Sequence, residues 1–229
     1  MNFRRNKLNL QLAKKIMLYY WKSFLYNKRN KTILIISIIS LFLLLFIFSK
    51  FLIYVENRHG VVLEDPLMKI FTAIDLNVPI FIVIYGSLVS GVIILMRSPE
   101  NLLIGIQTYS LMLIFRILGM YITPLDIPFG SINLQDPFVF IFGTGQIITK
   151  DLFFSGHTAT LFIIFLVMKN KKLKLVYLFL TITVAIMIYL QKAHYLLDIL
   201  VAPFVSYTSY RIILNLKRII LKQHYSIEE

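Results

Sequence analysis

Six apolar segments, each roughly as long as a bilayer is thick, make up most of this chain. A helix needs about 20 apolar residues to cross about 30 Å of hydrocarbon, and these segments have 16 to 23 residues each. They are residues 32–54, 78–96, 102–121, 153–168, 173–190 and 196–216. We therefore expect an all-α polytopic membrane protein with six transmembrane helices. The fourth and fifth segments are short, which a locally thinner membrane would accommodate.

The composition agrees with this class and excludes several others. Hydrophobic residues make up 58% of the 229 residues and charged residues only 15%, which is too apolar for a soluble domain of this size. The chain has no cysteine, so disulfides and thiolate metal sites are excluded. Abundant Ile, Phe, Leu, Lys and Asn are typical of an AT-rich bacterial coding sequence, so the expected location is the bacterial inner membrane.

The net charge of +13 would suit a nucleic-acid binder, but its distribution has another explanation. Residues 1–31 hold nine Lys/Arg and no acid, and further basic residues follow the second, fourth and sixth segments. By the positive-inside rule both termini are cytoplasmic. Most acids then fall on the outer side: Glu56, Glu64, Asp65, Asp75, Asp126, Asp136, Asp151 and Asp198. Topology thus explains the basic charge, and we expect no nucleic-acid partner.

These observations divide the chain into three parts. Residues 1–31 form a basic amphipathic cytoplasmic segment, for which an interfacial helix on anionic lipid and a partly disordered tail are both open. We expect residues 32–216 to form the six-helix transmembrane domain, which holds the candidate site residues. Residues 217–229 form a cytoplasmic tail.

Two short polar sites begin the fourth and sixth segments on the predicted outer side. One is Ser155-Gly156-His157 and the other is His194-xxx-Asp198. A spacing of four puts Asp198 on the same helix face as His194, where it can fix the tautomer and leave the other ring nitrogen as a nucleophile. His157 in turn is suited to protonate a departing oxygen. The structural alternatives are a polar pair between helices and an ordinary helix cap.

Several other polar residues are candidates for binding an anionic group such as a phosphate or for supporting the site. Ser155 is a natural N-cap, Gly156 allows close backbone approach, and a helix N-terminus attracts anions. Arg116 needs a partner among its apolar neighbours, either a phosphate or an acid such as Asp126 or Asp151, unless it snorkels to the interface. Lys192 either adds positive charge over the phosphate or faces water. The remaining supporting candidates are Asp151, Asp75 and Tyr195.

The motifs resemble a known family of membrane enzymes. The stretch from Asp151 to Thr158 and the stretch from Ala193 to Asp198 are similar to the two signature motifs of sphingomyelin synthases, and Arg116 opens a segment similar to the one that precedes them. The resemblance covers about residues 62–212. It implies a core like that of the type 2 phosphatidic acid phosphatase superfamily.

The chain departs from the hydrolases of that superfamily. Those carry Lys-x6-Arg-Pro, Pro-Ser-Gly-His and Ser-Arg-x5-His-x3-Asp, whereas this chain has no Arg-Pro, has Phe154 in place of the Pro, and has Met187-Ile188 in place of Ser-Arg. This favours the synthase branch. Gln191-Lys192-Ala193 stand where family synthases commonly have acids, so the head group stays open.

The resemblance implies transfer of a phospho-head group from a glycerophospholipid donor to a ceramide-like or diacylglycerol acceptor through a phosphohistidine. His194 would be the nucleophile, Asp198 its support and His157 the acid and base, at the periplasmic or exoplasmic side. No cofactor and no metal is implied. Two alternatives remain: a lipid phosphate phosphatase with water as acceptor, and a non-enzymatic membrane protein such as a scramblase. The oligomeric state is undecided, with a homo-oligomer left open.

Overall fold

The computed structural model describes residues 2–141 and 145–225, and within them the side chains other than those of residues 2–10, 13, 138 and 221–225. Over these residues the chain is helical, with no strand beyond an isolated bridge between Val61 and Leu125. The elements are α1 (Asn2–Tyr26), α2 (Lys28–Glu56), the 3-10 helix η1 (Pro66–Ile70), α3 (Asn77–Leu95), α4 (Pro99–Ile122), α5 (Pro137–Val139), α6 (Gly156–Val167), α7 (Lys171–Leu190) and α8 (Leu196–Tyr225).

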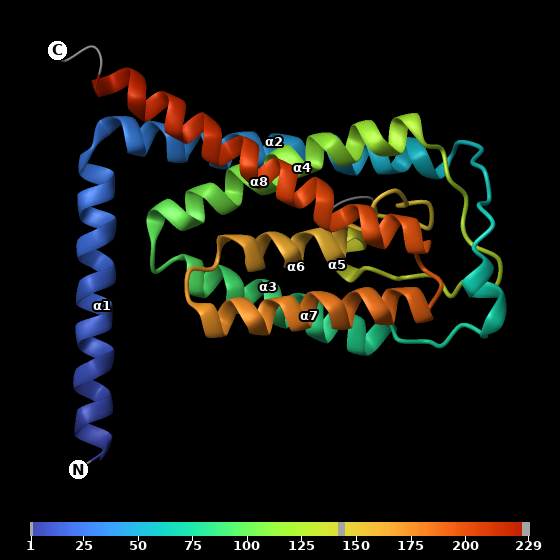
Figure 1. Cartoon of the computed structure of the whole chain (residues 1–229), viewed down its shortest axis with the longest axis horizontal. Helices are drawn as coiled ribbons and strands as arrows, with labels where there is room; N and C mark the ends of the chain where they lie inside the picture. The colour runs from blue at the N-terminus through green and yellow to red at the C-terminus, as the bar shows by residue number, and fades with distance from the viewer. Residues whose placement is uncertain (1, 142–144, 226–229) are drawn as a thin grey trace.

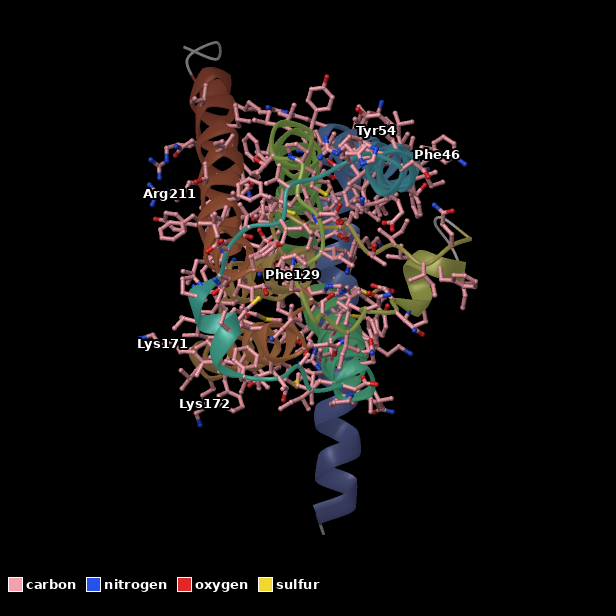
Figure 2. All side chains as sticks on the ribbon, turned by 90° about the vertical axis from the view of Figure 1, so that its right-hand side faces the viewer. Phe46, Tyr54, Phe129, Lys171, Lys172 and Arg211 are labelled. Carbon is pink, nitrogen blue, oxygen red and sulfur yellow. The ribbon has the colours of Figure 1, made fainter. Side chains whose placement is uncertain are left out.

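Among the described residues, five helices are long and apolar enough to cross a membrane: α2, α3, α4, α7 and α8. Large apolar side chains are exposed along them, and in Figure 2 the labelled Phe46 and Tyr54 of α2 point away from the bundle. A soluble protein does not expose such extensive apolar surface. The chain is therefore an integral membrane protein.

The fourth predicted segment differs from its expected span. Its helix begins at Gly156 rather than Phe153 and ends at Val167, so α6 has 12 residues and is only about 18 Å long. The next helix, α7, starts soon after α6 ends, because the side chain of Asn170 caps α7 by accepting from the amides of Lys172 and Leu173. This cap limits how far α6 extends. The short helix is surrounded by protein, so it does not need to match the membrane thickness by itself.

The helix α6 lies at the centre of the bundle. It packs against α3, α4, α7 and α8, and these helices share one apolar core with Ile84, Met112, Leu161, Ile188 and Ala202 among its buried residues. A second core joins α2 to α4. The central position of α6 brings its first turn next to the start of α8.

The helix bounds otherwise follow the predicted segments, with extensions at both ends of the chain. The residues up to Tyr26 form the helix α1, which runs across the bundle axes at one end of the molecule (Figure 1). Helix α8 continues past the predicted end at residue 216 to Tyr225, because no Gly or Pro interrupts residues 217–225. The last residues of the predicted tail, 226–229, lie outside the described part.

The connecting segments divide between the two ends of the bundle. Figure 1 shows the start of α2, the α3–α4 turn, the α6–α7 turn and the end of α8 at the end beside α1. The α2–α3 connection, the α4–α6 connection and the α7–α8 turn lie at the opposite end. The opposite end carries both predicted polar sites.

Candidate active site

A cavity of about 330 Å³ opens at the end of the bundle opposite α1. Four titratable side chains line it: Asp136, Asp151, His157 and His194. Most of its wall is built from the α4–α6 connection, which contributes both polar residues such as Gln135 and apolar ones. Figure 2 looks onto this end of the molecule, with the exposed Phe129 near its centre. The cavity therefore brings together the two histidines that the sequence singled out.

His194 and Asp198 are in contact, although they do not share a helix face as predicted, because His194 lies in the α7–α8 turn and α8 begins only at Leu196. Asp198 Oδ2 lies 3.3 Å from His194 Nδ1 and also accepts from the amide of Tyr195 at 3.3 Å. The side chain of His194 is 4% exposed and that of Asp198 is fully buried. With Nδ1 held by the carboxylate, Nε2 is the ring nitrogen left for chemistry.

The two polar sites are also joined through the backbone. The amide of Ser155, just before α6, donates to the carbonyl of Asp198 in the first turn of α8 at 3.1 Å. Ser155 caps α6 as predicted, since its Oγ accepts from the amide of Thr158 at 3.4 Å. This bond fixes the head of α6, and with it His157, against the head of α8.

Arg116 of α4 extends to the head of α6, where its guanidinium lies against Gly156. Its Nη2 donates to Asp151 Oδ1 at 2.7 Å, and its guanidinium lies over the ring of Phe48, 5.3 Å from the centroid. A Cβ on Gly156 would collide with this guanidinium. As expected of a glycine here, Gly156 allows another group to approach its backbone closely. That group is the guanidinium of Arg116.

Arg116 is buried behind the cavity wall rather than lining it. Its side chain is 7% exposed, and its Nε has no hydrogen-bond partner among the described residues. Asp151, which does line the cavity, separates the guanidinium from direct solvent contact by pairing with it. Of the two partner acids that the sequence allowed, Asp126 instead pairs with Lys150 at 3.0 Å.

Two other candidates, Lys192 and Tyr195, lie away from the cavity lining. Lys192 is buried with its Nζ 5.1 Å from the centroid of the Phe71 ring, so it does not face the cavity. Tyr195 donates its hydroxyl proton to the carbonyl of Asp126 at 2.9 Å, which ties the α7–α8 turn to the neighbouring loop. Both side chains brace the loops at the cavity end of the bundle.

Asp75, predicted as a supporting residue of the site, instead makes hydrogen bonds at the start of α3. Its Oδ1 accepts from the amide of Asn77 at 3.0 Å and from the side-chain amide of Asn77 at 2.9 Å. These hydrogen bonds lower the pKa of Asp75 below its ordinary value. Asp75 therefore holds the start of α3 and does not line the cavity.

Asp136 is the site residue that the sequence did not indicate. Its Oδ2 lies 3.1 Å from His157 Nε2, and its Oδ1 accepts from the hydroxyl of Tyr85 and, at 3.1 Å, from the amide of Val139. Burial alone would raise the pKa of Asp136, but hydrogen bonds from His157, Tyr85 and Val139 lower it to about 2. The only available signal was an acid before Pro137 in a long outer loop, which does not reveal its partner.

The described residues contain no group of three His, Asp or Glu side chains arranged to hold a metal ion. The acids of the site instead each pair with a basic side chain: Asp151 with Arg116, Asp136 with His157, and Asp198 with His194.

Comparison with known proteins finds a family model that matches part of the chain. Residues 150–216 match the family model described as PAP2 superfamily C-terminal. The matched region spans α6, α7 and most of α8 and includes His157, His194 and Asp198. No curated protein matches the chain.

Proposed function

We propose that this chain, whose residues 150–216 match the family model described as PAP2 superfamily C-terminal, transfers a phospho-head group between membrane lipids. The donor is a glycerophospholipid and the acceptor is a ceramide-like or diacylglycerol hydroxyl. Members of this superfamily typically are lipid phosphatases or phosphotransferases. The proposal selects the second activity, of the sphingomyelin synthase type.

The observation that carries the proposal is the pair of histidines facing one cavity, each with one ring nitrogen held by a carboxylate. Asp198 lies against His194 Nδ1 and Asp136 against His157 Nε2. Phosphoryl transfer through a covalent intermediate needs one nucleophile and one acid–base group. The cavity lining contains this pair.

In the proposed first step, His194 Nε2 attacks the donor phosphorus. The P–N bond forms while the bond from phosphorus to the glyceryl oxygen breaks, and that oxygen takes a proton from His157. Asp198 stabilises the positive charge that develops on the His194 ring. In the second step, the acceptor hydroxyl gives its proton to His157 and attacks phosphorus, and the P–N bond breaks.

The charge of the site supports a phosphodiester substrate over a phosphomonoester. Arg116 packs against Gly156 at the head of α6, and Asp151 already neutralises it. Lys192, the other predicted phosphate ligand, lies over Phe71 instead. A diester carries a single negative charge, whereas a monoester such as phosphatidic acid approaches two and calls for more positive charge.

The runner-up is a lipid phosphate phosphatase, which the family match favours equally. The two activities differ in the second step, where water replaces the lipid hydroxyl. We expect head-group transfer in vesicles that contain donor and acceptor lipid, and little phosphate release from phosphatidic acid. Strong phosphate release without any acceptor would overturn the transferase proposal.

A further inference from the structure

His157 has a protein partner that belongs to neither polar motif. Asp136 lies 21 positions earlier in the chain, and its Oδ2 contacts His157 Nε2 at 3.1 Å. Both side chains are 16% exposed. In this poorly solvated setting a hydrogen bond between a carboxylate and a ring N–H is stronger than it would be in water.

Asp136 is itself held rigidly in place. The hydroxyl of Tyr85, on α3, and the amide of Val139, in α5, both donate to its Oδ1. Oδ2 is therefore directed at the ring, and the edge contact of Phe81 with His157, at 6.1 Å between centroids, limits rotation of the imidazole. A pKa of about 2 keeps Asp136 ionised across the physiological range.

The other ring nitrogen of His157 is unsatisfied. Nδ1 is buried and has no hydrogen-bond partner among the described residues. A buried polar atom without a partner is rare in native proteins, and His157 lines the cavity. An oxygen of a bound lipid would provide the missing partner.

We propose that Asp136 is a positioning residue that holds His157 by Nε2–H and directs Nδ1 to the reacting oxygen. This inference rests on the proposed function. In the first step, the Nδ1 proton passes to the glyceryl oxygen as its bond to phosphorus breaks. In the second step, Nδ1 takes the proton of the acceptor hydroxyl as the new O–P bond forms. Asp136 remains a carboxylate throughout and stabilises the imidazolium that is present before the first step and again after the second.

The test compares Asp136→Asn and Asp136→Glu with Glu64→Gln in the full chain. Glu64 is a control because it pairs with Lys69 on the exposed outer surface, where an ion pair contributes little. We expect Asp136→Asn to lower kcat about 100-fold, at the lower end of what acid–base catalysis contributes, with KM little changed. Asp136→Glu should recover most of this loss. A kcat for Asp136→Asn equal to that of Glu64→Gln would overturn the inference.

A second readout does not depend on activity. In ¹⁵N NMR spectra of the histidine-labelled protein in detergent, recorded at a pH at which the ring is neutral and with His157 assigned through His157→Ala, the wild type should show His157 protonated at Nε2. Asp136→Asn should lose this single tautomer. An unchanged tautomer would overturn the role of Asp136 even if transfer were observed, whereas failure of transfer in the wild type with the tautomer present would overturn the proposed function alone.

Discussion

At the scale of single residues, Gly156 shows how closely the site is packed. Its Cα faces the guanidinium of Arg116, and a Cβ there would collide with it. We expect Gly156→Ala to displace Arg116 from Asp151, to destabilise the fold by about 1–3 kcal/mol, as overpacking does, and to lower transfer activity at least tenfold. Thermal unfolding and the transfer assay measure the two effects.

Gly86 of α3 provides the matched control. A Cβ at Gly86 meets nothing within 4 Å, and alanine is the better helix former. Gly86→Ala should therefore keep the activity and the melting temperature. If Gly156→Ala behaved like Gly86→Ala, the close packing of Arg116 on the head of α6 would be wrong.

The lowered pKa of Asp136 predicts a pH dependence of stability. Because the folded-state pKa is about 2, below the ordinary value of 3.8, the carboxylate stabilises the fold above about pH 4, and this contribution is lost as the pH falls through about 2. The melting temperature of the wild type should exceed that of Asp136→Asn at pH 5. The difference should shrink toward pH 2, and a difference that grew on acidification would contradict the assignment.

The sequence predicted the contacts between residues that are close together in the chain, but not those between residues that are far apart in it. The His194–Asp198 contact and the Ser155 cap were predictable because they depend on spacings of a few residues. The Asp136–His157 contact was not, because it depends on the path of a loop between α4 and α6. The placement of Lys192 could not be predicted either, since it depends on Phe71, which lies far away in the chain.

At the scale of elements, α1 is the clearest case of a helix outside the bundle. It runs across the bundle axes (Figure 1) and is fastened near its end, where Trp21 Nε1 donates to the carbonyl of Met96 at 2.7 Å. Lys14, Lys15 and Lys22 are exposed. These features support the interfacial helix over the disordered tail.

The only tryptophan of the chain makes this orientation measurable. Trp21 fluorescence should be quenched more by phospholipids brominated near the ester end of the acyl chain than by those brominated near the methyl end. Anionic lipid should strengthen the quenching, because each basic residue near such a surface contributes about 1 kcal/mol. The triple variant Lys14→Gln, Lys15→Gln, Lys22→Gln should lose this dependence. Equal quenching at both depths would rule out the interfacial position.

Most helix positions were predictable because long apolar segments are a strong signal, and the segments for α2, α3, α4, α7 and α8 each contain a helix of the expected kind. The length of α6 was not predictable, because hydropathy does not distinguish a helix that spans the membrane from a short one enclosed by others. Its bounds are set by the caps at Ser155 and Asn170.

At the scale of the whole molecule, the segregation of charge predicts which side the cavity faces. Basic residues gather at the end with α1, and the cavity lies at the opposite end. Because the chain has no cysteine, single cysteines report the topology. A membrane-impermeant maleimide should label Phe129→Cys in intact cells and Lys171→Cys only after the membrane is permeabilised. The reverse pattern would place the cavity on the cytoplasmic side.

The central claim is that His194 carries the phospho-head group between two lipids. The most direct measurement follows the phosphorus of a radiolabelled phospholipid in vesicles that hold the purified protein without acceptor, followed by addition of ceramide. The account predicts acid-labile label on the wild type and on Glu64→Gln, none on His194→Ala, and passage of the label to ceramide when it is added. Label transfer to ceramide by His194→Ala at the wild-type rate would contradict it.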